Sequence, residues 1–379
     1  MILKENIMSI HLGIVGAGSF AQCFIPLFKA HPLVREITLC DLDAAKLKEN
    51  SAQHGIRNTC ASLDRLLETD VDAVALFTQN WLHGPQAVKA LRAGKHVYSA
   101  VPAGVTVEEI RELVKAAEET GNIYMMGETS YYYPGVVYCR DKFQRGEFGH
   151  VVYGEAEYYH DWDHGLYDVM KWRGGERWIE TAGSPPMHYP THSTSMIVSV
   201  TGAWMTHVSC HGFVDKKDAH LYGPGTNQWG NPFSNQTALF SMSDGSCCRI
   251  NEFRRVGHVG TERMSLFGTE ACFEHNIPGM AWVKKNSCED VKALLTCGEN
   301  GYAPVHQTER LPREFASLRN GHCGTHHFLV DDFAKACVSG KQPPVHVWAA
   351  ARYTLPGIVA HESAMQGGAL FEIPDLGSP

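Results

Sequence analysis

The stretch GIVGAGSFA, residues 13–21, carries the strongest fold signal in this chain. An apolar run leads into it, and a helix-like pattern follows from residue 19 to residue 30. Glycines at 16 and 18 allow a tight turn and let the backbone approach a pyrophosphate, which then meets the N–H groups at the start of the helix. The spacing Gly16-x-Gly18-x-x-Ala21 therefore predicts a dinucleotide-binding turn.

An acid stands at the end of the next predicted strand, residues 37–41. Asp41 lies at the distance where a carboxylate takes the ribose hydroxyls, and no arginine stands beside it, so the sequence favours NAD over NADP. A doubly wound domain that binds no nucleotide is the structural alternative. The predicted cofactor-binding residues are Gly16, Gly18, Ser19, Phe20, Asp41, Asn80, His83, Val101 and Pro102.

Strand-like and helix-like segments alternate through the first part of the chain, which is typical of a parallel sheet. The sequence predicts an N-terminal Rossmann domain over residues 1–128. Its expected strands are 10–15, 37–41, 71–78, 96–100 and 123–128, and its expected helices are 19–30, 43–54, 82–93 and 106–120.

After Glu128 the pattern changes. We expect one helix over 134–145, alternating strands such as 151–160, 236–242 and 262–268, and two late helices near 325–338 and 348–366. The prediction is a second α/β domain over 129–379 with a mostly antiparallel open sheet, and a C-terminal helix able to pack back on the first domain.

Composition excludes several function classes. The net charge is −8 without a basic block, which argues against nucleic-acid binding. No apolar run reaches the ~18–20 residues that a membrane span needs, so no membrane association is expected. The first ten residues lack the pattern of a signal peptide, and the 12 cysteines show no C-x-x-C spacing. We therefore expect packed, reduced thiols and a cytoplasmic protein.

Further stretches carry a family resemblance. LHGPQAVKALRAGKHV (82–97), GEFGHVVYGEAEYYHD (146–161) and VWAAARYTLPGIVAHESAMQGG (347–368), together with the glycine turn, resemble the Gfo/Idh/MocA oxidoreductases. The resemblance covers nearly the whole chain. It implies an N-terminal Rossmann domain, a C-terminal α/β domain whose open sheet covers the active site, and a homo-oligomer, either a dimer or a tetramer.

Two departures from the family pattern distinguish this chain from the usual members of the family. The family usually carries Glu-Lys-Pro where this chain has Ala100-Val101-Pro102, and valine cannot orient or protonate a substrate hydroxyl as that lysine does. His188 stands where the family usually has an aspartate, and Ser195 replaces a later acid.

The motifs VPAGVTVEE (101–109) and YPTH (189–192), with Glu128 before a tyrosine cluster and EYYHD at 157–161, fit a subgroup better. They resemble the NAD-dependent glycoside hydrolases of the α-N-acetylgalactosaminidase type, glycoside hydrolase family 109. The resemblance implies redox-neutral cleavage of a carbohydrate: transient oxidation at C3, elimination of the C1 group, water addition and re-reduction. The implied catalytic residues are His192, Tyr158, Glu128, His160 and Tyr189.

Local geometry supports a role for these side chains. On a strand, Tyr158 and His160 share one face. Pro190 suits the first turn of a helix, so Tyr189 and His192 would lie three apart on that turn and face the same way. We assign His192 to the C3 hydroxyl and Tyr158 to the C2 proton. A tyrosine base needs a pKa lowered from about 10, so a nearby cation or NAD⁺ must help.

Other interpretations stay open. A glycoside 3-dehydrogenase that releases a keto-sugar is the nearest alternative, and a non-catalytic NAD and sugar sensor is another. His192 could be only a helix cap or a core residue. The clusters HDWDH (160–164) and HCGTHH (322–327) have ligand types suited to a metal, but no metal is predicted. The predicted substrate-binding residues are Trp172, Arg173, Arg177 and His322.

Overall fold

The computed structural model describes residues 9–276 and 279–379, so most of the stretch that was searched for a signal peptide lies outside the described residues. The chain forms two compact units. The N-terminal unit takes residues up to Tyr132, Cys297–Ala351 and the last two residues, and the second unit takes Tyr133–Thr296 and Arg352–Gly377. This division differs from the expected single boundary after residue 128, because residues 297–351 group with the N-terminal residues.

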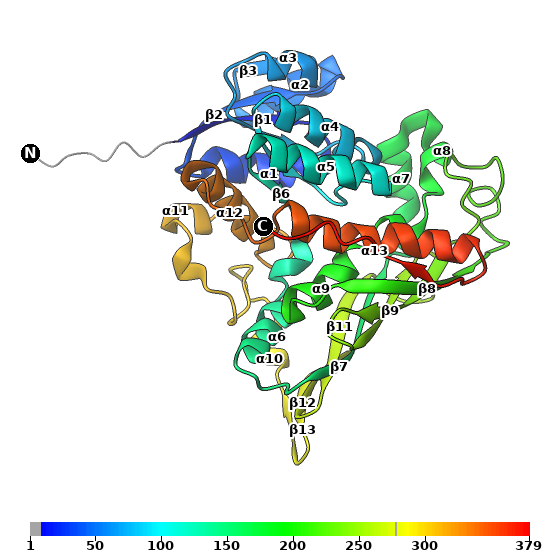
Figure 1. The fold of residues 1–379 in the computed structure, drawn as a ribbon. Coiled ribbons are helices and arrows are strands. Elements are labelled where there is room, and N and C mark those ends of the chain that lie inside the picture. Colours follow the sequence, from blue (N-terminus) through cyan, green and yellow to red (C-terminus); the bar gives the residue numbers. More distant parts are fainter. Residues whose placement is uncertain (1–8, 277–278) are drawn as a thin grey trace, which may run out of the picture. The chain divides into compact units, whose positions relative to one another are not determined.

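The N-terminal unit contains a six-stranded parallel sheet in the order β3-β2-β1-β4-β5-β6 (Figure 1). The reversal of strand order at β1 and β4 is the doubly wound arrangement that the sequence predicts. Its elements are β1 Ile10–Val15, α1 Ser19–Ala30, β2 Val34–Cys40, α2 Ala44–His54, β3 Asn58–Cys60, α3 Leu63–Leu67, β4 Ala73–Leu76, α4 Asn80–Arg92, β5 His96–Ser99, α5 Val107–Thr120, β6 Tyr124–Met126 and the 3₁₀ turn η1 Thr129–Tyr132.

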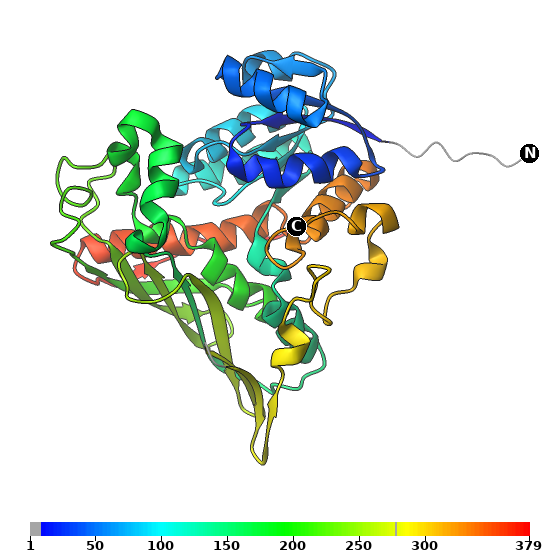
Figure 2. The same cartoon turned by 180° about the vertical axis from the view of Figure 1, so that it is seen from behind.

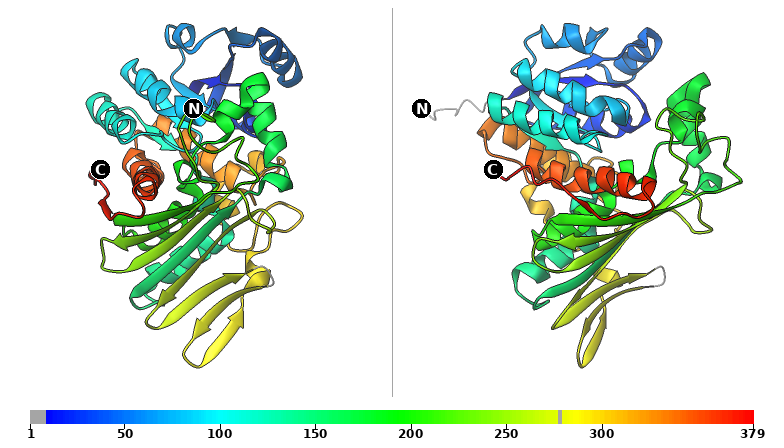
Figure 3. Two further views of the ribbon diagram at one scale, coloured as in Figure 1. Left: turned by 90° about the vertical axis from the view of Figure 1, so that its right-hand side faces the viewer. Right: turned by 45° about the vertical axis from the view of Figure 1, so that its right-hand side comes forward.

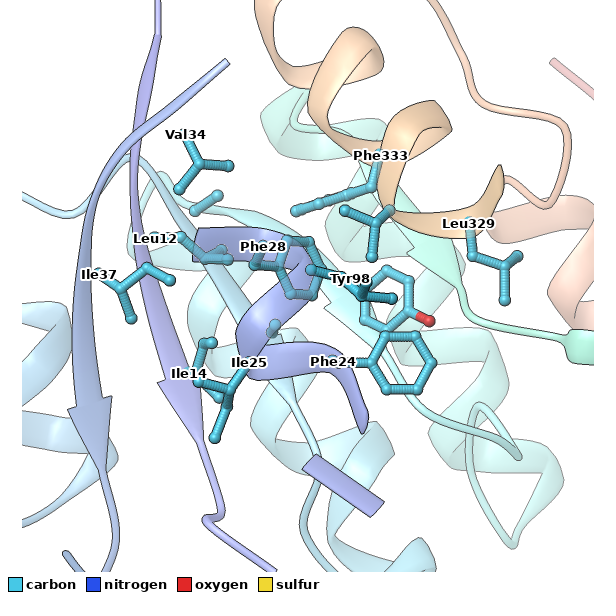
Figure 4. Packing of buried hydrophobic residues seen from close by; sticks show 14 of the residues in the cluster. Leu12, Ile14, Phe24, Ile25, Phe28, Val34, Ile37, Tyr98, Leu329 and Phe333 are labelled. Carbon is cyan, nitrogen blue, oxygen red and sulfur yellow. The ribbon is translucent and has the colours of Figure 1, made fainter. Parts of the chain in front are cut away.

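A late helix completes the core of this unit. Helix α12, Thr325–Ser339, packs against α1, and the two helices lie side by side in Figure 2. Leu329 and Phe333 of α12 are fully buried with Phe24 and Phe28 of α1 in one apolar cluster (Figure 4). Burial of such side chains contributes about 1.5–3 kcal/mol each, which explains why residues 297–351 belong to this unit. The segment also holds η5 Thr308–Arg310 and α11 Arg313–Ala316.

The second unit is built on a nine-stranded mixed sheet, whose green-to-yellow strands are visible in Figure 3. Its order is β14-β13-β12-β11-β7-β10-β9-β8-β15, and only the β7–β10 pairing is parallel among the described strands. The strands are β7 Val151–Tyr159, β8 Met205–Phe213, β9 Asn235–Met242, β10 Cys247–Phe253, β11 Thr261–Gly268, β12 Ala271–Asn276, β13 Gly279–Lys284, β14 Ser287–Asp290 and β15 Phe371–Glu372.

Helices of the second unit connect and cover these strands. They are α6 Pro134–Gln144, η2 Trp162–His164, α7 Leu166–Gly174, η3 Gly175–Arg177, α8 Trp178–Ala182, η4 Pro186–His188, α9 Thr191–Thr201 and α10 Lys292–Leu295; α13, Val347–Met365, contributes its larger part to this unit. Helix α9 packs on β7, β10 and β11. A Cβ on Gly154 of β7 would stand 3.2 Å from Ile197 of α9, so glycine there permits the close approach.

Helix ends follow the signals in the sequence. Thr106 caps α5 by accepting the N–H of Glu109, whose carboxylate accepts the N–H of Val105. Gly121 ends the same helix in the left-handed conformation. Within the described ranges, no helix is long and apolar enough to cross a membrane.

One cysteine pair departs from the expectation of reduced thiols. Cys297 and Cys323, both in the N-terminal unit, form a disulfide with a Cα–Cα distance of 5.8 Å. The other cysteines, ten in number, are free. The pair joins two loops far apart in sequence, and no spacing rule in the sequence indicates that contact.

Candidate active site

The glycine turn has the geometry that a pyrophosphate needs. Gly16 has φ of +89°, and a Cβ there would stand 2.8 Å from the carbonyl oxygen of Phe77. Gly18 is the N-cap of α1 and offers no side-chain cap to the helix N–H groups. The turn therefore excludes side chains and leaves the start of α1 available to an anion.

Asp41 lies directly after β2 and beside this turn. Its carboxylate accepts the N–H of Ala17 at 2.8 Å through one oxygen and the N–H of Asp43 at 2.8 Å through the other. These bonds fix the carboxylate at the carboxyl end of the sheet. The position fits an acceptor for ribose hydroxyls.

The remaining predicted cofactor residues lie in the neighbouring loops of the same unit. His83 is buried, and its ring nitrogens lie 2.9 Å from the Pro102 carbonyl oxygen and 3.0 Å from that of Thr78. His83 thus joins the loop after β4 to the loop after β5, where Val101 is also buried. Asn80 begins α4. Ser19 and Phe20 form the first turn of α1, and the Phe20 ring packs against Phe77.

Together, these residues form a nucleotide cradle: Gly16, Gly18, Asp41, His83 and Pro102 with their loops. The open helix start, the close backbone approach at Gly16 and the fixed carboxylate fit NAD. When bound, NAD⁺ supplies the hydride acceptor, and the protein supplies position and proton transfer.

Two further predicted residues lie in the N-terminal unit. Glu128 is fully buried, and one carboxylate oxygen accepts the N–H of Ser130 at 2.9 Å. His322 has its ring 6.3 Å from that of Phe20, and its Nδ1 lies 2.8 Å from Nε2 of His326. The structure therefore places His322 next to the first turn of α1. Within residues 9–276 and 279–379, no three His, Cys, Asp or Glu side chains are grouped to hold a metal.

In the second unit, four predicted catalytic residues meet. We call Tyr158, His160, Tyr189 and His192 the Tyr158 cluster. The Tyr158 hydroxyl lies 3.1 Å from Nδ1 of His160. The Tyr158 ring lies 5.3 Å from that of His192 and 6.0 Å from that of Tyr189, and the rings of Tyr189 and His192 are 5.2 Å apart.

The local backbone explains this meeting, with one correction to the predicted helix start. Tyr158 and His160 share one face at the end of β7, as the alternation predicts. Helix α9 begins at Thr191 with Pro190 as its N-cap, so Tyr189 lies just before the helix instead of on its first turn. The backbone at Tyr189, with φ of −129° and ψ of 54°, still brings its ring against His192.

Burial sets the protonation states in the cluster. It lowers the pKa of His160 to about 4, and the charges of Arg254 and Arg173 act in the same direction. His160 is therefore neutral near pH 7 and can accept the Tyr158 O–H at Nδ1. Burial also raises the pKa of Tyr158 above its ordinary value, while the Arg254 guanidinium opposes that rise. The resting phenol is protonated.

The predicted sugar-binding side chains of α7 and η3 are exposed. Trp172 is 53% exposed, and the Arg177 guanidinium makes an exposed ion pair with Glu180. Arg173 is also exposed, but its charge reaches His160. Of these three residues, only Arg173 shows an interaction with the Tyr158 cluster.

Sequence reasoning missed Glu252 and Arg254 in the stretch NEFRR, 251–255. The register of β7 and β10 pairs Glu252 with Tyr158, and the Arg254 guanidinium carbon lies 4.8 Å from the centre of the Tyr158 ring. The available signal was that Glu252 and Arg254 continue the alternation of the buried apolar residues Cys248 and Ile250. A charge on a face that packs against a helix is unusual without a partner.

The N-terminal part of the chain matches a known protein family. Residues 10–128 match the oxidoreductase family with an NAD-binding Rossmann fold, GFO_IDH_MocA. This protein carries the NAD-binding domain of that family. The predictions of NAD as cofactor and of an NAD-dependent Gfo/Idh/MocA-type enzyme are confirmed.

Two curated relatives match different shares of the chain. A glycosyl hydrolase family 109 protein of Saccharopolyspora erythraea is 24% identical over 395 residues, which cover 97% of this chain and 83% of that protein. The alpha-N-acetylgalactosaminidase of Bacteroides fragilis is 36% identical over 138 residues, covering 35% of this chain and 32% of that enzyme. The predicted resemblance to both groups is confirmed.

Solved structures agree in fold. A levoglucosan dehydrogenase has a TM-score of 0.79 at 17% identity, covering 97% of this chain and all of its own. A scyllo-inositol dehydrogenase from Lactobacillus casei has a TM-score of 0.71 at 15% identity, covering 97% and 98%. These likenesses confirm the α/β class with a parallel N-terminal sheet and a mostly antiparallel second sheet.

Proposed function

We propose that this enzyme cleaves a glycoside without net redox change, through transient oxidation at C3 of the sugar. The observation that carries the proposal is the Tyr158 cluster, in which two phenols and two imidazoles have neighbouring ring centres no more than 6.1 Å apart. Cleavage by elimination needs proton transfers at several substrate atoms, and this cluster supplies the groups. The similarity to glycosyl hydrolase family 109 proteins supports the same reaction.

His192 would take the proton of the C3 hydroxyl in this scheme, and NAD⁺, held by the nucleotide cradle, would supply the hydride acceptor. The resulting ketone makes the C2 proton acidic. Tyr158 would remove the C2 proton in its phenolate form, and neutral His160, whose Nδ1 lies 3.1 Å from the phenol oxygen, can donate a hydrogen bond to that oxygen. The C2–H electron pair forms the C1–C2 double bond, and the C1–O bond breaks. The departing oxygen would take the proton that Tyr158 removed. Water would then add its oxygen to C1 and a proton to C2 before C3 is reduced again.

The other predicted residues hold the sugar in this proposal. Glu128 and Tyr189 bind hydroxyl groups, and Trp172 offers an exposed aromatic face of the kind that sugars stack on. Arg173, Arg177 and His322 complete the predicted substrate contacts. The absence of the family's lysine is consistent with a different route for the hydroxyl proton, because buried Val101 cannot transfer one.

A sugar 3-dehydrogenase is the second candidate, because structural neighbours with the same fold are named as dehydrogenases of levoglucosan and inositols. The dehydrogenase would release a keto-sugar and NADH. A sensor that binds NAD and a sugar without turnover is disfavoured by the Tyr158 cluster, because simple binding does not require the His160 pKa of about 4. We further propose a homo-oligomer, dimer or tetramer, located in the cytoplasm.

One experiment separates these candidates. The purified protein is incubated with NAD⁺ and a panel of aryl glycosides, and aglycone release and NADH absorbance are followed together. We expect catalytic aglycone release without net NADH. Accumulation of NADH without aglycone would establish the dehydrogenase, and neither signal with any glycoside would support the sensor.

A further inference from the structure

A buried pair of opposite charges lies beside the Tyr158 cluster. Glu252 has no exposed surface, and Arg254 is 7% exposed. Nη2 of Arg254 lies 3.3 Å from Oε2 of Glu252. Burying two charged groups is costly, and such a pair stabilises a protein little compared with apolar packing. The pair therefore calls for an explanation other than stability.

Arg254 is held in one place. Its backbone N–H donates to Oδ1 of Asn235 at 3.0 Å, and its guanidinium donates to the carbonyl oxygens of Phe253 and Pro186 at 3.3 and 3.5 Å. In this position the guanidinium carbon lies 4.8 Å from the centre of the Tyr158 ring. A fixed cation at this distance from a phenol stabilises the phenolate form.

Glu252 connects the pair to the helix that carries His192. Ser193, the next residue along α9, donates its hydroxyl to Oε1 of Glu252 at 2.6 Å. Burial raises the pKa of Glu252 to about 8, and Arg254, Ser193 and His192 oppose that rise. Burial therefore favours the neutral form of Glu252, whereas the Ser193 hydroxyl and Arg254 favour its carboxylate.

We propose that Arg254 is a positioning residue whose fixed positive charge stabilises the Tyr158 phenolate. In this ionisation the O–H bond of Tyr158 breaks and its proton passes to water. Its use in turnover rests on the proposed function; its effect on Tyr158 does not. Arg254 is thus the nearby cation that a tyrosine base requires.

The other charged groups facing Tyr158 act against ionisation. Glu252 of β10 and Glu262 of β11 are both paired with Tyr158 in strand register, and each raises its pKa, as does Tyr189. Arg254 is the cation whose charge acts in the opposite direction on Tyr158. Removing its charge and removing that of Glu252 should therefore move Tyr158 ionisation in opposite directions, which a purely structural role does not predict.

The same strand offers a matched control. Arg249 of β10 also pairs with buried acid, at 3.1 Å from Glu157 and 2.9 Å from Glu155. Its register partner on β7 is Glu155, on the sheet face opposite Tyr158. Arg249→Gln removes a half-buried arginine of this sheet without touching the Tyr158 cluster.

The test replaces Tyr158 in the full-length, NAD-loaded protein by a fluorinated tyrosine, whose phenol is more acidic, and follows its ionisation by ¹⁹F NMR. In Arg254→Gln, we expect the midpoint to rise by about one pH unit or more. In Glu252→Gln, we expect the midpoint to fall, and in Arg249→Gln we expect it to stay unchanged. Arg254→Lys keeps the charge, so its ionisation midpoint should lie between those of Arg254→Gln and the parent protein.

Turnover supplies the second readout on proteins with natural Tyr158. Arg254→Gln should lower kcat about 10- to 100-fold and move the acidic limb of the pH–rate profile to higher pH. An unmoved fluorine midpoint in folded Arg254→Gln overturns the proposal. If Arg254→Gln does not fold, the variant Arg254→Gln/Glu252→Gln, which leaves no unpaired buried charge, is compared with Glu252→Gln, and equal midpoints in these two variants overturn the proposal. Absence of glycoside turnover in the parent protein would overturn the proposed function alone, because the fluorine midpoint is measured without substrate.

Discussion

The nucleotide cradle and the Tyr158 cluster solve different physical problems. The cradle is made mostly of backbone: a glycine that no side chain can replace at φ of +89°, a free helix start and loops tied together by His83. The Tyr158 cluster is made of side chains whose protonation depends on burial and on Arg254. A change that disturbs the backbone of the cradle should lower its affinity for NAD. A change of a side chain in the Tyr158 cluster should lower the turnover rate.

The largest expected effect tests the cluster. His192→Ala should lower kcat by about 10³-fold or more, because it removes a general base in contact with Tyr158 and Tyr189. NADH binding, measured by fluorescence titration, should not change. His207→Ala on β8, outside the cluster, is the control and should retain full rate. Unchanged turnover in His192→Ala would remove His192 from the catalytic residues.

The next effect tests the cradle. Gly16→Ala places a Cβ 2.8 Å from a backbone oxygen in a conformation that alanine rarely adopts, so NADH affinity should fall about tenfold or more. Gly94→Ala is the control, because Gly94 has φ of +78° but no heavy atom within 4 Å of the added Cβ. Both variants strain the backbone, but only Gly16→Ala should weaken the binding of NADH. Equal NADH affinity in the two variants would contradict the assigned turn.

Acid should destabilise both units of the protein through buried neutral histidines. Burial lowers the pKa of His188 in the second unit to about 3, with His361 adding to the effect, and burial likewise lowers the pKa of His326 in the N-terminal unit to about 3. A depressed histidine pKa gives full stability above about pH 6.5, and this stability is lost as pH falls towards the folded-state pKa. For His188 alone the loss at pH 5 is about 2 kcal/mol.

The measurement is urea unfolding at pH 7 and pH 5. In His188→Gln the difference in unfolding free energy between the two pH values should shrink by about 2 kcal/mol. His150→Gln, at an exposed position, should leave the difference unchanged. An equal pH dependence in both variants would show that His188 does not resist protonation.

The smallest effect concerns the edge of the proposed sugar site. Arg177→Ala should change stability by less than about 1 kcal/mol, because its ion pair with Glu180 is exposed. If Arg177 binds substrate as proposed, KM should rise several-fold at unchanged kcat. Lys171→Ala, an exposed cation on α7, is the control. Equal KM values in the two variants would limit the sugar site to residues nearer Tyr158.

The difference between the two regions also explains what the sequence could predict. The residues of the cradle lie in short continuous stretches whose sequence patterns predict strands and turns. The predicted strands at 10–15, 37–41 and 96–100 are present as β1, β2 and β5. Strand β3 was missed because three residues are too few to show alternation. The long strand β8, in contrast, contains polar and histidine residues on both faces, so its pattern is weak.

Part of the Tyr158 cluster was also predictable. Strand alternation correctly placed Tyr158 and His160 together, and the YPTH stretch brought Tyr189 to His192. Arg254 and Glu252 could not be predicted, because their contact with Tyr158 arises from the parallel pairing of β10 with β7. Register between strands so distant in sequence is decided by the packing of the whole sheet. The Cys297–Cys323 pair is a further contact of this kind.

The discontinuous N-terminal unit has a consequence for biosynthesis. Its core includes Leu329 and Phe333, which are translated only after the whole segment Tyr133–Thr296 of the other unit. At typical rates of synthesis this delay is on the order of ten seconds or more. Until then the nascent chain exposes the apolar face of α1 that α12 later covers. A polypeptide that stops after residue 132 should therefore need a chaperone, and a fragment offered for NAD-binding studies must retain residues 297–351.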